Sequence, residues 1–220
     1  MAISKGWKWE VLSKDDEYWN TPDFMIHYLN NRWKKANFKT FLDIGCGLGR
    51  HSIYMAENGF KVYGIDYSNY VIDIVKEKAY NKGLDIKLSV GNIAKLPYED
   101  ESIDCIGAIG VLSNSDKNGI SLILKEMHRV LKEGGETYFN IISKLSDMGN
   151  NEELINGNSY YNINEEDFEW LFKDFRILSI KHIDELYNSM ETSSYCVLLK
   201  KVNKNNSFEE SKIKDNMFLI

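Results

Sequence analysis

Short apolar runs alternate with amphipathic stretches between residues 40 and 142 of this 220-residue chain. The apolar runs have the length of buried strands, and the stretches between them repeat apolar side chains at helical spacing. Such alternation predicts a parallel sheet with helices on both faces. The expected strands cover 40–44, 61–65, 85–90, 103–109 and 135–142. The expected helices begin at Arg50 and Asn69, with a short one near Ala94 and a longer one over 117–131.

The two ends of the chain follow other patterns. Thr21-Pro22 is typical of a helix start before the first strand. Beyond residue 142, a connection rich in glycine and asparagine leads to a helix expected from Asn164, as its N-cap, to Lys173. Alternating positions over 175–183 and 194–201 predict two closing strands. We therefore expect an N-terminal helical cap (1–39), a main α/β domain (40–202) and a C-terminal segment (203–220) that is either a mobile tail or a terminal helix.

Composition narrows the class of protein. The length fits one domain, and 43% hydrophobic with 27% charged residues is ordinary for a soluble globular chain. Charged residues interrupt the first 19 positions, so no signal peptide is expected. The longest apolar run, near 103–112, is too short to span a bilayer. These features predict a cytoplasmic protein that does not associate with membranes.

Cysteines, histidines and net charge favour a small-molecule site. The three cysteines lie far apart without a C-x-x-C pair, and the four histidines lack ligand spacing, so neither a disulfide nor a metal site is expected. The net charge is −6. The densest basic stretch, 32–39, is either a solvated helix face, which we favour, or an RNA contact. A nucleic-acid partner is therefore not expected.

The segment Phe41–His51 carries the strongest chemical signal. A short strand containing Asp43 is followed by Gly45, Gly47 and Gly49 and then by residues that can open a helix. Glycines tolerate positive φ and let backbone N–H groups approach a ligand, while the helix start presents a positive dipole end. The segment thus predicts a nucleotide-sized site, or else a glycine-rich turn in some other α/β protein.

The glycine spacing bears on which nucleotide would bind. A dinucleotide fingerprint is G-x-G-x-x-G, and Arg50 occupies the place of its third glycine. A diphosphate would also be repelled by the Asp43 carboxylate, whereas a ligand with an ammonium and a sulfonium would not. About twenty residues after the loop, the second expected strand ends in Asp66, which can accept both ribose hydroxyls or can act only as a capping acid. Ser68 is a plausible N-cap for a helix over 69–81.

These segments resemble the class I S-adenosylmethionine-dependent methyltransferases, of the type 11/25-like branch that acts on small molecules. Asp43 to Gly49 matches motif I, D-x-G-x-G-x-G, and Gly91-Asn92-Ile93 matches the adenine motif with asparagine in place of the usual acid. Leu96–Ile109 and Glu126–Asn140 resemble the family's later motifs, with Glu133 replacing a proline and the pair Gly134-Gly135 expected to end the helix.

The resemblance implies a Rossmann-like fold. It would contain a mostly parallel seven-stranded sheet with an antiparallel C-terminal strand and helices on both faces. It implies S-adenosylmethionine as cofactor and S-adenosylhomocysteine as product. Asp66 would bind the ribose, the Asn92 oxygen could still accept from the adenine amino group, and Ile93 and Tyr67 could sandwich the ring. The expected cofactor-binding residues are Asp43, Gly45, Cys46, Gly47, Gly49, Asp66, Tyr67, Asn92, Ile93 and Ile109.

The resemblance also implies methyl transfer by in-line displacement, which requires no universal catalytic residue, so none is assigned. The segment 109–115 lacks the N/D-P-P-Y/F element of base-amino and glutamine methylases, and no Pro-Cys occurs in the chain. A small-molecule acceptor is therefore expected. Tyr18, Trp19, Tyr160 and Tyr161 could line its pocket or serve only as lid packing. A non-catalytic nucleotide-binding module and an NAD-dependent oxidoreductase remain alternatives.

Overall fold

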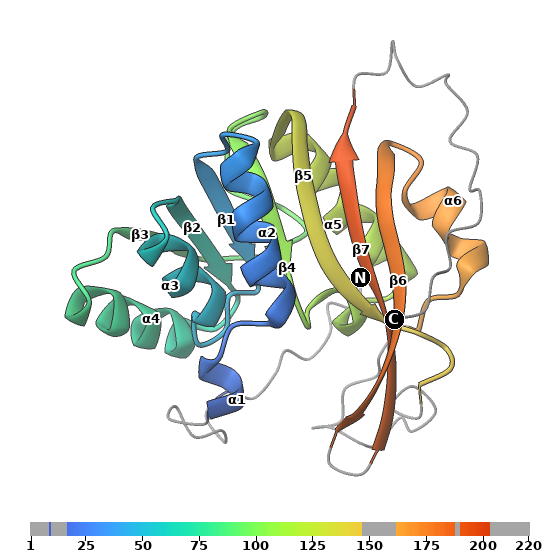
Figure 1. The fold of residues 1–220 in the computed structure, drawn as a ribbon, viewed down its shortest axis with the longest axis horizontal. Coiled ribbons are helices and arrows are strands. Elements are labelled where there is room, and N and C mark those ends of the chain that lie inside the picture. The colour runs from blue at the N-terminus through green and yellow to red at the C-terminus, as the bar shows by residue number, and fades with distance from the viewer. Residues whose placement is uncertain (1–8, 10–16, 147–161, 188–189, 203–220) are drawn as a thin grey trace.

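A seven-stranded sheet forms the centre of the protein (Figure 1). The structure, a computed structural model, describes residue 9 and residues 17–146, 162–187 and 190–202. The strands are β1 (Thr40–Ile44), β2 (Lys61–Asp66), β3 (Ile86–Val90), β4 (Ile103–Ala108), β5 (Leu131–Ile142), β6 (Phe175–Tyr187) and β7 (Met190–Lys201). The α-helices of the described part are α1 (Glu17–Asn20), α2 (Phe24–Lys35), α3 (Arg50–Glu57), α4 (Asn69–Asn81), α5 (Lys117–Val130) and α6 (Phe168–Leu171).

The strand order is β3-β2-β1-β4-β5-β7-β6. Strands β1 to β5 pair in parallel, whereas β7 is antiparallel to both β5 and β6. This is the predicted fold, a mostly parallel seven-stranded sheet with an antiparallel strand near the C-terminus. Because parallel strands all end at the same edge of the sheet, the segments after β1, β2, β3 and β4 meet there.

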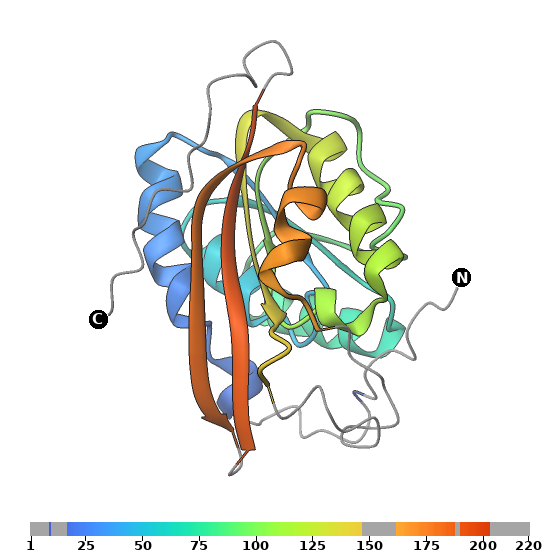
Figure 2. The same ribbon diagram turned by 90° about the vertical axis from the view of Figure 1, so that its right-hand side faces the viewer.

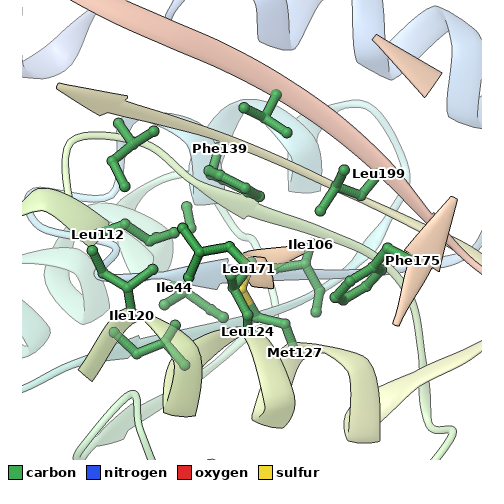
Figure 3. Packing of buried hydrophobic residues seen from close by; sticks show 14 of the residues in the cluster. Ile44, Ile106, Leu112, Ile120, Leu124, Met127, Phe139, Leu171, Phe175 and Leu199 are labelled. Atoms are coloured by element: carbon green, nitrogen blue, oxygen red, sulfur yellow. The ribbon is translucent and has the colours of Figure 1, made fainter. Parts of the chain in front are cut away.

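Helices cover both faces of the sheet, as the alternating pattern predicted (Figure 2). Helices α2 and α3 pack on one face around a cluster that includes Trp33, Phe41 and Met55. Helices α5 and α6 pack on the other face, where Ile120, Leu124 and Met127 of α5 and Leu171 of α6 meet apolar side chains of the sheet (Figure 3).

Helix α2 is bound to the sheet by a buried polar group. Its N-cap is Asp23, whose Oδ1 accepts a hydrogen bond from the Met25 N–H, so the helix begins two residues later than the predicted start at Thr21-Pro22. Near its other end, Arg32 and Trp33 both donate to the carboxylate of Glu136 on β5. The two elements are about a hundred residues apart in sequence, so only the folded chain brings them together.

Two of the predicted helical features are wrong. The segment near Ala94 forms turns rather than a helix, because the Asn92 side chain accepts the Ala94 N–H at 2.8 Å and closes a local turn instead. The pair Gly134-Gly135 does not end α5, which stops at Val130. It lies within β5 at a shift of register, where Ile103 pairs with Leu131 but Cys105 with Glu136. Gly134 has φ +76°, which a bulge in a strand can require.

Further boundaries differ from the sequence prediction near the C-terminus. Asn164 is an N-cap, as predicted, and it forms a capping box with Asp167. It precedes a 3₁₀ turn (Glu165–Asp167), however, and the single-turn helix α6 that follows ends at Leu171 rather than Lys173. Ser68 occupies the N-cap of α4, but its side chain makes no capping hydrogen bond. The C-terminal segment 203–220 lies outside the described residues. No helix in the described ranges is long and apolar enough to cross a membrane.

Candidate functional site

A cavity of about 760 Å³ opens at the carboxyl edge of β1 to β4. Its size falls in the range typical of small-molecule sites. The lining residues come from the segments that follow these four strands, from the start of α5 and from the N-terminal aromatic residues. Of the predicted cofactor-binding residues, those that line it are Gly45, Cys46, Gly47, Asp66, Tyr67, Asn92, Ile93 and Ile109.

The glycine loop has the backbone that its composition predicted. Gly45, Gly47 and Gly49 have φ of +65°, +50° and +81°, and residues other than glycine rarely adopt this backbone region. A Cβ at Gly45 would overlap Val111, and one at Gly47 would lie 2.7 Å from Cη2 of Trp9. The loop therefore presents bare backbone to its neighbours. Gly49 itself supports the turn as the N-cap of α3 and is not among the lining residues.

Asp66 lies beside this loop at the end of β2. Its Oδ2 accepts from the Gly47 N–H at 3.1 Å, and its Oδ1 accepts from the Ser68 N–H at 3.0 Å. Burial raises the pKa of Asp66, although the N–H groups of Ser68 and Gly47 act in the opposite direction. Each carboxylate oxygen has capacity for a further hydrogen bond. The side chain thus offers fixed acceptor oxygens at the cavity wall.

Asp43, in contrast, does not line the cavity. It lies behind the glycine loop, 2% exposed, and its Oδ2 accepts from Oγ of Ser52 at 2.6 Å. Burial raises the pKa of Asp43 to about 7, against the lowering effect of the Ser52 hydrogen bond. Asp43 therefore lies where it supports the loop from behind and does not face the cavity.

The raised pKa of Asp43 predicts a pH effect on the stability of the ligand-free protein. The unfolded side chain loses its proton near pH 4, whereas the folded one keeps it until about pH 7. Between these values the folded state binds more protons, so the free energy of unfolding should fall as the pH rises from about 4 to about 7. Asp43→Asn should remove this contribution, and urea unfolding of both proteins at pH 5 and pH 8 measures it.

The pKa values of two neighbouring groups also change on folding. The test therefore uses the difference in pH dependence between Asp43→Asn and the unaltered protein. Asp66 has a raised pKa, so its contribution to the free energy of unfolding falls as the pH rises, as for Asp43. His51 has a pKa well below its usual value because of burial and the nearby Arg50. Its contribution to the free energy of unfolding therefore rises with pH. Both groups persist in Asp43→Asn. An equal pH dependence in the variant and the unaltered protein would contradict the prediction.

His51 and Arg50 attach the N-terminal segment to the glycine loop. The Nε2 atom of His51 accepts from the Asp23 N–H at 3.2 Å. The guanidinium of Arg50 donates to the carbonyl oxygens of Tyr18 and Thr21 at 2.9 and 3.3 Å. It also lies 5.3 Å from the ring centre of Tyr18. Arg50, at the place of a dinucleotide fingerprint's third glycine, thus holds the segment that contains α1.

Aromatic residues of this N-terminal segment form part of the cavity wall. Trp9 and Trp19 both line it, and their rings meet edge to face at 5.3 Å. Trp9 also packs against Leu48. Tyr18 stacks edge to face on Trp19 but is half exposed and is not among the lining residues. The predicted Tyr160 and Tyr161 lie outside the described residues.

One wall of the cavity was not predicted from the sequence. This wall comprises the loop after β4 and the first turns of α5, and it includes Val111, Asn114, Ser115, Asp116, Asn118, Gly119, Leu122 and Ile123. The signal that could have found it is topological: β4 is parallel to β1, so its following segment must reach the same edge. Asp116 is the N-cap of α5 and accepts from the Gly119 N–H, which fixes the start of this helix at the cavity.

Comparison with known proteins agrees with this geometry. Residues 42–139 match the protein family described as "Methyltransferase domain". The chain is 38% identical over 105 residues to a demethylmenaquinone methyltransferase of Geobacillus stearothermophilus, covering 45% of this chain and 43% of that protein. It is 34% identical over 111 residues to sterol 4-C-methyltransferase strm-1 of Caenorhabditis elegans, covering 48% and 32%. The chain thus matches half or less of the length of these two relatives.

The similarity in fold covers more of this chain than the sequence matches do. The crystal structure of an S-adenosylmethionine-dependent methyltransferase from Clostridium acetobutylicum superposes with a TM-score of 0.67 at 20% identity. The superposition covers 86% of this chain and 96% of that one. Residues 42–139 therefore match a methyltransferase domain family, and the sheet has the fold of solved S-adenosylmethionine-dependent methyltransferases.

Proposed function

We propose that this protein binds S-adenosylmethionine in the cavity at the carboxyl edge of the sheet and transfers its methyl group to a small-molecule acceptor. The observation that carries the proposal is the position of the Asp66 carboxylate. It lies at the cavity wall, hydrogen-bonded to the N–H of Gly47 in a loop whose glycines have positive φ. A carboxylate can accept both ribose hydroxyls, and bare backbone allows the close approach of the rest of a nucleoside.

The other residues of the site fit this cofactor. When bound, S-adenosylmethionine supplies an electrophilic methyl group on a positively charged sulfonium. The Asp66 carboxylate beside the loop suits a cationic ligand, and the Asp43 carboxyl group behind the loop adds to this above about pH 7, where it is ionised. Ile93 and Tyr67 offer apolar contacts to the base. Trp9 and Trp19 can exclude water and, as aromatic rings, attract a nearby cation by about 0.5–2 kcal/mol.

The acceptor would be held by the same cavity, since its volume exceeds what the cofactor alone requires. Its wall combines the apolar residues Leu122 and Ile123 with polar Asn114. The Oδ1 atom of Asn114 is buried and has no hydrogen-bond partner among the described residues, so a donor group of the acceptor would reach it after a rotation of this side chain. Holding a nucleophile in line with the methyl group is enough to accelerate the transfer, because alignment can contribute roughly 7–11 kcal/mol.

Different segments of the chain would bind the cofactor and cap the cavity. We propose that residues 40–202 bind the cofactor and that residues 1–39 form an N-terminal cap whose Trp9 and Trp19 line the cavity. Arg50 supports this arrangement because it donates to backbone oxygens of α1 and Thr21. Relatives that match this chain over less than half of their length bear the names of different acceptors, a demethylmenaquinone and a sterol. The acceptor of this protein therefore has to be found by experiment.

Calorimetry with S-adenosylhomocysteine tests the cofactor assignment. We expect a dissociation constant in the micromolar range, and no binding of NAD at the same concentrations. No binding of S-adenosylhomocysteine at millimolar concentration would overturn the proposal. Incubation with methyl-labelled S-adenosylmethionine and a metabolite extract then separates an enzyme from a binding module. A labelled product is expected, and its absence with a protein that binds the cofactor would favour the module.

A further inference from the structure

The side chain of Asn92 is fixed in one orientation at the base end of the cavity. Its Oδ1 accepts a hydrogen bond from the Ala94 N–H at 2.8 Å. A backbone N–H requires an acceptor, so the oxygen and not the NH2 group must occupy this position. Asn92 also lines the cavity and is exposed to it at the tip of β3. A ligand next to Asn92 therefore meets an amide whose oxygen is already engaged.

An aspartate at this position would present a different surface. With one carboxylate oxygen on the Ala94 N–H, the other would remain as an acceptor for the exocyclic amino group of adenine. Asparagine places its NH2 group, a donor, where that second oxygen would be. Rotating the amide would restore the acceptor but would leave the Ala94 N–H without the Asn92 oxygen as its partner.

The orientation of the Asn92 amide determines which purine bases match the hydrogen-bonding groups of the site. Asn92 and Ile93 both line the cavity after β3. With the base of the proposed complex against these two residues, its edge would meet the Asn92 NH2 group and the Ile93 backbone N–H, which are two donors. Adenine presents a donor at position 6 and an acceptor at N1, which gives one match and one mismatch. A 6-oxopurine presents an acceptor at position 6 and a donor at N1, which also gives one match and one mismatch. An aspartate, in contrast, would match adenine at both positions and the 6-oxopurine at neither.

We propose that Asn92 is a specificity-determining residue that makes the nucleoside subsite accept 6-oxopurines about as well as adenine. The inference rests on the proposed function and concerns the base of the nucleoside that occupies that same site. Its substrate class is a purine nucleoside thioether, with the 6-oxo form bound alongside the 6-amino form. The chemistry that recognises it is the NH2 group of Asn92, which is the polar group of this lining side chain that remains after the amide oxygen accepts from the Ala94 N–H.

The test compares S-adenosylhomocysteine with its deaminated analogue S-inosylhomocysteine by calorimetry. For the unaltered protein we expect dissociation constants within about threefold of each other. Asn92→Asp should bind S-adenosylhomocysteine more tightly and S-inosylhomocysteine more weakly. The ratio of the two constants should then rise by at least about tenfold, as expected when polar groups at a base edge are mispaired.

A matched variant controls for the added charge. Asn69→Asp places the same charge at an exposed asparagine on the first turn of α4 that does not line the cavity, and should leave the ratio unchanged. A preference of tenfold or more for S-adenosylhomocysteine in the unaltered protein, or an unchanged ratio in Asn92→Asp, would overturn the inference and leave the proposed function intact. Failure of the unaltered protein to bind either compound would overturn the proposed function, and the inference with it.

Discussion

Asp66→Ala is expected to weaken the binding of S-adenosylhomocysteine by at least about 100-fold. In the proposed complex the carboxylate accepts both ribose hydroxyls, and each hydrogen bond to a charged group contributes about 1.5–3 kcal/mol. Two such bonds correspond to a loss of a hundredfold or more. The substitution also removes the acceptor of the Gly47 N–H, so the loop loses a contact that holds its shape. Calorimetry with the purified variant measures the change.

Two further variants separate a loss of binding from a loss of structure. Asp73→Ala removes an acid from the exposed face of α4, where its side chain is 74% exposed, and should bind as the unaltered protein does. Asp66→Asn keeps one acceptor oxygen and should bind with intermediate affinity. If Asp66→Ala keeps the thermal unfolding midpoint and also binds within threefold of the unaltered protein, the ribose contact assigned to Asp66 is wrong.

Glu136→Ala is expected to cause the largest loss of stability, about 3–5 kcal/mol of the free energy of unfolding. The Glu136 side chain is 5% exposed and accepts from Nε and Nη2 of Arg32 at 2.7 and 2.8 Å. It also accepts from Nε1 of Trp33 at 3.0 Å. Trp33 is fully buried, so the substitution would leave its N–H without a partner, which by itself costs about 1–3 kcal/mol.

Urea unfolding followed by circular dichroism measures this effect. Glu133→Ala is the matched control, because Glu133 is an exposed acid on the same strand, and it should change the free energy of unfolding by less than about 0.5 kcal/mol. Glu136→Gln should fall between the two, since an amide oxygen still accepts but its NH2 group opposes the Arg32 donors. A loss under 1 kcal/mol in Glu136→Ala would show that α2 is held mainly by its apolar contacts.

Local sequence signals predicted the parallel half of the molecule well. The strands β1, β2 and β4 and the helices α4 and α5 lie within one or two residues of their predicted bounds, and α3 begins at the predicted residue. Their signals are local: an apolar run for each strand and a glycine or a capping residue next to each helix. The loop glycines were predictable for the same reason, because a positive φ is a property of one residue and its neighbours.

Features that depend on long-range contacts were predicted less well. The Gly134-Gly135 pair resembles a helix end in sequence, but pairing with β4 draws these residues into a bulge of β5. The segment near Ala94 has a helical composition, but one side-chain hydrogen bond from Asn92 closes a turn there. Asp43 belongs to the loop motif, yet its direction within β1 turns it toward Ser52 and away from the cavity.

By itself, the sequence determined the order of strands and helices, the glycine loop and the acid that follows the second strand, since each is encoded by residue types close together in the chain. The tertiary structure alone decided which groups face the cavity. The wall from α5, the aromatic residues held by Arg50 and the amide of Asn92 turned by the Ala94 N–H all depend on distances between side chains and backbone in the folded chain. Residue types set what each of these groups can donate or accept, and packing sets which way it points.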